Sequence, residues 1–261
     1  MCRFMVYKGL ATDKLPYWLL NSDNSLLKQS ISDESRRPNP DGWGVVCRDR
    51  DKLQVFKNTL PAFQDDKFAA SLSKIRGEMV FAHIRRRSQG PVLMENTHPF
   101  VHQERWVFMH NGNIPNFEYC KEQMSLLLTP EVEIKTGGTT DSEFLFKYFL
   151  HLFEQKSNCD VFCAMNIVKK IISKLAALTQ ENDQHLLALN FVLTDGNFVV
   201  GFRRNRSLHY ASLPEGILIA SEPVDGELRW NEVPENHFIL WEEAARIKLV
   251  SSDLEFAFAE L

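Results

Sequence analysis

The sequence lacks the features that would place it in a membrane, outside the cell or on nucleic acid. Its 261 residues contain no apolar run of about 18 residues, so no transmembrane helix is expected. No basic region followed by an apolar stretch opens the chain, which argues against a secretory signal. The formal net charge of −4 is opposite in sign to a general nucleic-acid-binding surface. We therefore expect a cytoplasmic protein with neither a membrane nor a nucleic-acid partner.

Cysteines are few and form no recognisable motif. There are five, an odd number without a CxxC pair: Cys2, Cys47, Cys120, Cys159 and Cys163. This usage fits free thiols in a reducing compartment. Cys159 and Cys163 are four residues apart, but no histidine or second cysteine pair nearby in the sequence completes a zinc site. We expect no metal and no cofactor.

What the chain does have is a cysteine directly after the initiator methionine. Methionine aminopeptidase removes Met1 when the next residue is small, which would leave a thiol and a free α-amine on Cys2. An α-amine has a pKa of roughly 7.7–8 and a thiol about 8.5, so the amine can take the thiol proton near neutral pH. A terminal amine can serve as the base for such a nucleophile. The alternative interpretation is a buried, inert cysteine.

The hydrophobic pattern predicts many strands and a few helices. Because the strands pair as hairpins rather than alternating with helices, we expect an α+β chain with antiparallel sheets. Thr140 and Glu143 have the spacing of a capping box, and no repeat or linker interrupts the chain, so 1–261 is expected to be a single domain. The expected strands are 3–8, 43–47, 53–56, 78–84, 105–110, 186–194, 197–203, 207–211 and 217–221, and the expected helices are 68–75, 141–155 and 160–178, with short helical pieces within 15–30.

Several polar segments in the first half carry residue types suited to binding or catalysis. Residues 85–87 are three arginines that end a buried strand, where a guanidinium can bind a carboxylate or simply face water. Asn111 and Gly112 end another strand and could donate to a developing oxyanion, or form an ordinary Asn-Gly turn. Asp141 opens a helix at the positive end of its dipole. Residues 39–44, Asn-Pro-Asp-Gly-Trp-Gly, predict a tight turn before a strand.

Taken together and in this order, these segments resemble the class II glutamine amidotransferases, a branch of the N-terminal nucleophile hydrolases. The turn at 39–44, the segment 220–223 and Trp230 are similar to the stand-alone branch, which includes glutathione-degrading amidotransferase subunits and the γ-glutamyl hydrolase of ergothioneine synthesis. The resemblance implies a four-layer αββα sandwich of two antiparallel sheets flanked by helices. The matching segments are Met1-Cys2, Ala82-His83-Ile84-Arg85, Asn96-Thr97-His98-Pro99, His110-Asn111-Gly112 and Thr140-Asp141-Ser142-Glu143.

The resemblance also implies roles for individual residues. Cys2 would attack a γ-glutamyl amide carbonyl and form a thioester, with its own α-amine as the base. Asn111 and Gly112 would form the oxyanion hole. His98 would have a structural role and order the loop beneath the site.

For substrate binding, the resemblance implies a clamp of two opposite charges. Arg85 would bind the α-carboxylate of the glutamyl group, with Ser88 in support, and Asp141 would bind its α-ammonium. The residue types agree with this independently, because a γ-glutamyl group carries one anion and one cation on a single carbon.

The expected activity is hydrolysis of a γ-glutamyl amide bond in glutamine or a γ-glutamyl peptide or amine, alone or with a peptidase partner. Arg86 and Gln89 stand where synthase-linked relatives often carry an aromatic residue and a histidine, which points away from glutamine itself. Arg86 or Arg87 could bind a distal carboxylate of the substrate, or face water. Alternatives are a glutaminase subunit that delivers ammonia to a separate synthase, a non-catalytic binding subunit of the same fold, and an amidase acting on acyl amides.

Overall fold

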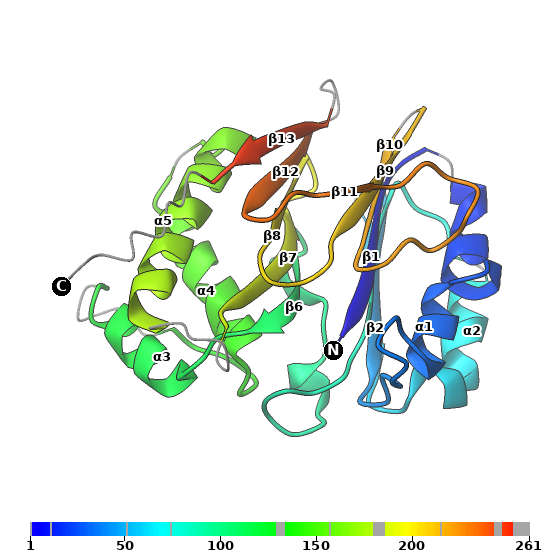
Figure 1. The fold of residues 1–261 in the computed structure, drawn as a ribbon, viewed down its shortest axis with the longest axis horizontal. Helices are drawn as coiled ribbons and strands as arrows, with labels where there is room; N and C mark the ends of the chain where they lie inside the picture. Colours follow the sequence, from blue (N-terminus) through cyan, green and yellow to red (C-terminus); the bar gives the residue numbers. More distant parts are fainter. Residues whose placement is uncertain are drawn as a thin grey trace.

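Two antiparallel β-sheets pack face to face between two layers of helices in the computed structural model (Figure 1). Helices α1 (Leu26–Ile31) and α2 (Asp66–Leu72) cover one sheet, and α3 (Phe117–Ser125), α4 (Asp141–Glu154) and α5 (Val161–Thr179) cover the other. The expected α+β class and αββα sandwich are therefore confirmed. The structure describes residues 2–10, 12–50, 52–73, 75–128, 134–156, 158–179, 186–214, 216–242 and 247–252.

The first sheet has the strand order β11-β9-β10-β1-β4-β2-β3, with every pair antiparallel. Strand β1 lies inside it, and Met5 pairs with Ala82 on one side and Ala220 on the other. Every residue of β1 is buried, and Cys2 comes directly before it. The strands are β1 (Arg3–Gly9), β2 (Trp43–Asp49), β3 (Lys52–Asn58), β4 (Met79–Ile84), β9 (His209–Leu213), β10 (Gly216–Ala220) and β11 (Asn231–Glu232).

The second sheet has the strand order β13-β12-β8-β7-β6-β5. The pairing of β6 with β7 sets Gly112 opposite Leu189 at one end and Val107 opposite Thr194 at the other. The candidate oxyanion residues therefore lie at one end of this sheet. Its strands are β5 (Phe100–His102), β6 (Trp106–Asn113), β7 (Ala188–Thr194), β8 (Phe198–Arg203), β12 (His237–Glu242) and β13 (Lys248–Ser251).

The alternation of side chains along each strand divides the apolar residues into three clusters. Met5 and Tyr7 of β1 pack in the cluster under α1 and α2, whereas Phe4 and Val6 pack in the cluster between the sheets. A third cluster joins α3, α4 and α5 to the second sheet. No described helix combines the length and hydropathy needed to cross a membrane. The short helices are η1 (Thr12–Lys14), η2 (Tyr17–Asn21), η3 (Ala62–Gln64) and η4 (Met94–Asn96).

All the expected strands and helices are present, but the sequence prediction was incomplete. It missed β5, α3 and the C-terminal strands β11, β12 and β13. Of the two hydrogen bonds that the predicted capping box implies, only one is present. The backbone N–H of Glu143 donates to Thr140 Oγ1 at 3.3 Å, but the Glu143 carboxylate accepts from Gly137 and Gly138 instead of returning to the cap.

Candidate active site

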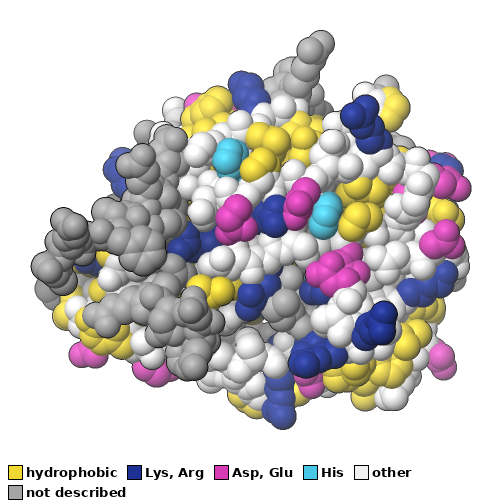
Figure 2. Space-filling model, viewed as in Figure 1, with side chains coloured by type: hydrophobic (Ala, Val, Ile, Leu, Met, Phe, Trp, Pro, Cys, Tyr) yellow, Lys and Arg dark blue, Asp and Glu magenta, His cyan; other side chains and the backbone are white. Residues whose placement is uncertain are grey.

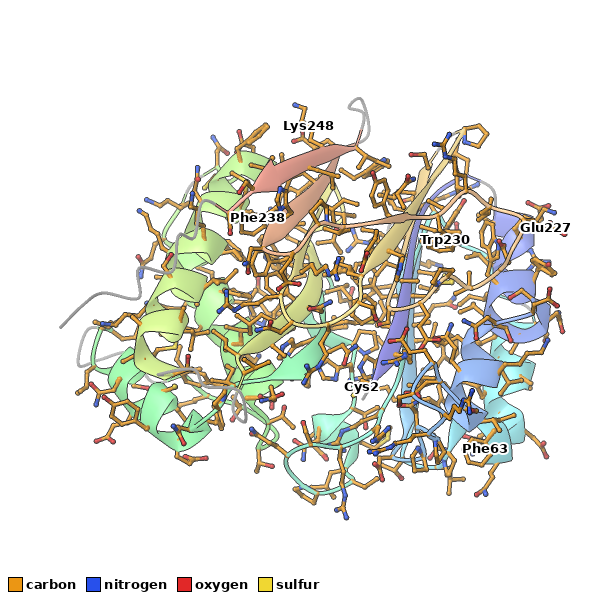
Figure 3. All side chains as sticks on the ribbon, in the orientation of Figure 1. Cys2, Phe63, Glu227, Trp230, Phe238 and Lys248 are labelled. Carbon is orange, nitrogen blue, oxygen red and sulfur yellow. The ribbon has the colours of Figure 1, made fainter. Side chains whose placement is uncertain are left out.

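The Cys2 side chain lies at the start of β1, between the two sheets (Figure 3). Its thiol donates to the Arg86 carbonyl oxygen at 3.2 Å, and the Arg86 backbone N–H points at the same sulfur, with nitrogen and sulfur 3.4 Å apart. Burial raises the pKa of the thiol, and the Arg86 N–H and the charges of Arg85 and Arg3 oppose this only in part. The thiol is therefore protonated near neutral pH and needs a base to become a nucleophile.

A small pocket opens at Cys2, and its walls come from segments that are far apart in the sequence. Residues 85–89 contribute one wall, and residues 140–142 at the start of α4 contribute another. The fold thus brings together most of the site residues expected from the sequence. Those that line the pocket are Cys2, Arg85, Ser88, His98, Gly112 and Asp141.

Arg85 is buried at the end of β4 and fixes the loop that follows it. Its Nη1 donates to the Pro91 carbonyl oxygen and its Nη2 to that of Gln89, both at 3.0 Å. Burial lowers the pKa of the guanidinium, which nevertheless stays charged because arginine is so basic. With five N–H groups and two of them in these bonds, Arg85 keeps donors for a ligand in the pocket.

Asp141 is the first residue of α4 and is buried at the helix N-terminus. Its Oδ2 accepts from the Ile114 N–H and its Oδ1 from the Ser142 N–H, both at 2.8 Å. Thr140 caps the helix in front of it. The carboxylate is therefore fixed in orientation, and its remaining lone pairs can accept from a cationic ligand.

Asn111 and Gly112 lie near the end of β6. The Asn111 side chain is 2% exposed, and its Nδ2 has no hydrogen-bond partner among the described residues. A buried donor without a partner is costly, which favours a role in which a ligand oxygen accepts from it. A Cβ at Gly112 would overlap the Ala188 carbonyl oxygen, so only glycine permits the close approach of β7 here.

Two buried histidines, His98 and His110, line the pocket, and a third, His83, packs against His98; the sequence analysis singled out only His98. His110 Nε2 is 3.1 Å from the Ala188 carbonyl oxygen and must carry a proton, so its Nδ1 accepts from Ser142 Oγ at 2.9 Å. The imidazoles of His83 and His98 stack with their centroids 4.4 Å apart. The only signal for His83 and His110 was their place inside the matching motifs.

Arg3 was also missed, although a charged residue directly before a buried apolar run was a signal. Its side chain is fully buried and forms an ion pair through Nε with Glu222. Its Nη2 is 3.3 Å from an Asp33 carboxylate oxygen, and its Nη1 donates to the Cys2 carbonyl oxygen at 3.0 Å. Arg3 therefore ties the start of β1 to two distant segments and fixes the backbone at Cys2.

Two antiparallel sheets between helix layers form the fold of the N-terminal nucleophile hydrolases. A glutamine aminotransferase class-II domain protein of Silicibacter pomeroyi superposes with a TM-score of 0.66 at 22% identity, covering 96% of this chain and 99% of that one. The glutamine phosphoribosylpyrophosphate amidotransferase of B. subtilis superposes with a TM-score of 0.65 at 17% identity, covering 97% and 50%. These likenesses confirm the fold.

The chain belongs to the class-II glutamine amidotransferases, since the model of that family matches residues 27–214, well over half of its length. It is 28% identical to the probable glutamine amidotransferase DUG3 of Saccharomyces cerevisiae, over 92% of this chain and 81% of the yeast protein. It is 24% identical to a gamma-glutamyl-hercynylcysteine sulfoxide hydrolase of Mycolicibacterium smegmatis, over 92% and 95%. The family match begins after Cys2 and therefore gives no evidence about this residue. The evidence that concerns Cys2 is its position in the fold.

Proposed function

We propose that this protein hydrolyses a γ-glutamyl amide bond through Cys2 and releases glutamate with ammonia or an amine. One observation carries the proposal: Cys2, Arg85 and Asp141 line the same small pocket. They supply a nucleophile, a fixed cation and a fixed anion. The names of the yeast and mycobacterial relatives, an amidotransferase and a γ-glutamyl hydrolase, support this class of reaction.

Binding would use the two charges on the α-carbon of the glutamyl group. The free N–H groups of Arg85 would pair with the α-carboxylate, and Asp141 would accept from the α-ammonium. Both side chains are held by backbone groups before any ligand arrives, so little ordering entropy is lost on binding. The clamp would leave the γ-carbonyl at the other end of the ligand to meet Cys2.

Catalysis would begin with the thiol proton passing to the α-amine that removal of Met1 exposes on Cys2. The thiolate would attack the γ-carbonyl carbon, and the oxyanion would accept from Asn111 Nδ2 and the Gly112 N–H. Collapse would expel ammonia or an amine, protonated by the α-ammonium, and leave a thioester. Water, deprotonated by the same amine, would then release glutamate and restore the thiol.

Arg86 supports a second carboxylate on the leaving side of the substrate. Its side chain is half-buried in the pocket wall, and its Nη1 is buried without a hydrogen-bond partner among the described residues. Lys and Arg side chains also gather on the lower part of the face in Figure 2, the side on which Figure 3 labels Cys2. A γ-glutamyl peptide with a free carboxylate should therefore be cleaved better than its amide. Equal rates for the peptide and its amide would contradict this preference.

The test combines intact mass with a glutamine-mimicking diazoketone and a glutamate-release assay. We expect a protein without Met1 that takes a single adduct on Cys2, and glutamate release that Cys2→Ser abolishes. A processed chain that takes no adduct and cleaves no γ-glutamyl compound would contradict the proposal. Assays with added peptidase or synthase candidates address the expected partner. The five free cysteines support the proposed cytoplasmic location.

A further inference from the structure

The turn before β2 makes three hydrogen bonds with the arginine segment that follows β4. The Asp41 N–H donates to the Arg85 carbonyl oxygen at 2.9 Å, and the Arg85 N–H donates to the Gly42 carbonyl oxygen at 2.8 Å. The Arg87 N–H donates to Asp41 Oδ2 at 2.9 Å. These bonds extend the β2–β4 pairing beyond Ile84, the last residue of β4, and Trp43, the first residue of β2. Asp41 thus binds the residue on each side of Arg86, once through its backbone and once through its side chain.

Arg86 is the residue whose backbone contacts the candidate nucleophile. Its carbonyl oxygen accepts from the Cys2 thiol and its N–H donates to the sulfur. Both contacts require the peptide groups on either side of Arg86 to keep their orientation. Because Asp41 binds Arg85 and Arg87, a change at Asp41 would reach the Cys2 sulfur through one intervening residue.

The turn itself is anchored, so Asp41 can act as a rigid support. The Asn39 side chain is buried, and its Nδ2 donates to the Gln29 carbonyl oxygen at 2.9 Å. Its backbone N–H donates to the Ser30 carbonyl oxygen, also at 2.9 Å. Gly42 has a φ of +109°, and a Cβ there would come within 2.8 Å of the Asn58 carbonyl oxygen. The turn is therefore tied to α1 on one side and lies against β3 on the other.

We propose that Asp41 is a positioning residue that sets residues 85–87 against Cys2, an inference that rests on the proposed function of Cys2. Its carboxylate accepts from the Arg87 N–H and so fixes the peptide group whose oxygen, that of Arg86, accepts from the Cys2 thiol. Its backbone N–H binds the Arg85 oxygen and so fixes the peptide group whose N–H, that of Arg86, points at the sulfur. The same carboxylate also acts on Arg85, where its charge opposes the lowering of the guanidinium pKa by burial. Asp41 does not line the pocket and would act only through these neighbours.

The test uses two variants that separate the hydrogen bond from the charge. Asp41→Ala removes the acceptor for the Arg87 N–H, whereas Asp41→Asn keeps an acceptor oxygen and removes the charge. We would measure the rate of Cys2 alkylation by iodoacetamide, followed by mass mapping of the Cys2 peptide, together with kcat and KM. Freeing the Arg86–Arg87 peptide group removes the fixed acceptor that favours the protonated thiol and holds the sulfur in place. Asp41→Ala should therefore speed alkylation and lower kcat, each about fivefold. In Asp41→Asn, Cys2 should be alkylated at a rate within about twofold of the wild type, and any fall in kcat/KM should come from a higher KM.

Asp195→Ala is the matched control. Asp195 also accepts from a backbone N–H, that of Asn197, but it lies beyond the end of β7 that is remote from Leu189, the partner of Gly112. This variant should lower the melting temperature without changing the alkylation of Cys2. If Asp41→Ala folds and its Cys2 reacts at the wild-type rate, the inference is overturned. A fivefold fall of kcat in Asp41→Asn also overturns it, and this outcome does not depend on Asp41→Ala folding. Alkylation needs no γ-glutamyl substrate, so a wild-type protein without hydrolase activity would contradict the proposed function and leave this test intact.

Discussion

The buried rings of His83 and His98 stack on each other with their centroids 4.4 Å apart, and His98 lines the pocket of the candidate nucleophile. Burial, with the nearby charge of Arg85 second, lowers the pKa of His83 from 6.5 to about 3. Burial together with His83 lowers the pKa of His98 well below 6.5. Both imidazoles are therefore neutral in the folded protein.

This neutrality predicts a loss of stability in mild acid. The unfolded chain binds protons on both histidines as the pH falls below 6.5, and the folded chain does not until much lower pH. The contribution is full above pH 6.5 and is lost progressively below it, by up to about 1.4 kcal/mol per pH unit for each histidine. Urea unfolding on either side of pH 6.5 measures this. His83→Phe, which keeps a flat ring against His98, should reduce the slope, and a pH-independent wild type would show that the pair is not neutral by burial.

The unpartnered amide of Asn111 predicts a loss confined to the chemical step. Asn111→Ala and the near-isosteric Asn111→Asp both remove the Nδ2 donor, and each should lower kcat about 10²–10³-fold. Alkylation of Cys2 by iodoacetamide passes through no oxyanion and should change little. Steady-state kinetics and the alkylation rate together provide the check. A normal kcat in Asn111→Asp would show that Asn111 does not stabilise the oxyanion.

The fixed carboxylate of Asp141 predicts a loss of substrate binding. Asp141→Asn should lower kcat/KM by about 2–5 kcal/mol in free-energy terms, because the α-ammonium would lose its counter-charge in a buried site. The matched control is Glu143→Gln, two residues further on, whose carboxylate accepts from the Gly137 and Gly138 N–H groups. That variant should lose thermal stability but keep kcat/KM. Equal kinetic losses in the two would mean that Asp141 supports the helix start and not the substrate.

Gly44 predicts a structural coupling between β2 and the loop that carries His98. A Cβ at Gly44 would overlap the His98 carbonyl oxygen, so Gly44→Ala must push this loop away from the strand. We expect a destabilisation of about 1–3 kcal/mol and a fall in activity, measured by urea unfolding and glutamate release. Gly226→Ala is the control, because nothing lies within 4 Å of its added Cβ, and it should be silent. A Gly44→Ala protein as stable and active as the control would show that the loop yields at little cost.

Local patterns were enough to predict the α+β class, because apolar runs bounded by turn signals mark β1, β2, β4 and β7. The four-layer sandwich was predicted from the family resemblance. Local patterns were insufficient for β13 and β11, which are short and partly exposed, and for α3, whose apolar face is narrow. For these elements, tertiary contacts decide the conformation more than local preference does.

The candidate site divides in the same way. Cys2, Arg85 and Asp141 could be named from the sequence because they lie in dense motifs. The ion pair of Arg3 with Glu222 could not be predicted, because 218 residues lie between the two in the sequence and only the folded chain brings them together. The same holds for Asp41, whose turn motif predicted a bend but not the peptide groups it would contact.

The burial of Arg3 has a practical consequence for anyone who prepares this protein. Chain ends usually fray and tolerate additions. Here the second side chain after the initiator is enclosed among carboxylates, and its neighbour is the candidate nucleophile. An affinity tag ahead of Met1 would convert the amine on Cys2 into an amide, and a protease that leaves even one extra residue would do the same. The proposed mechanism therefore predicts that a preparation tagged at the N-terminus is inert however well it folds, and purification tags belong at the C-terminus.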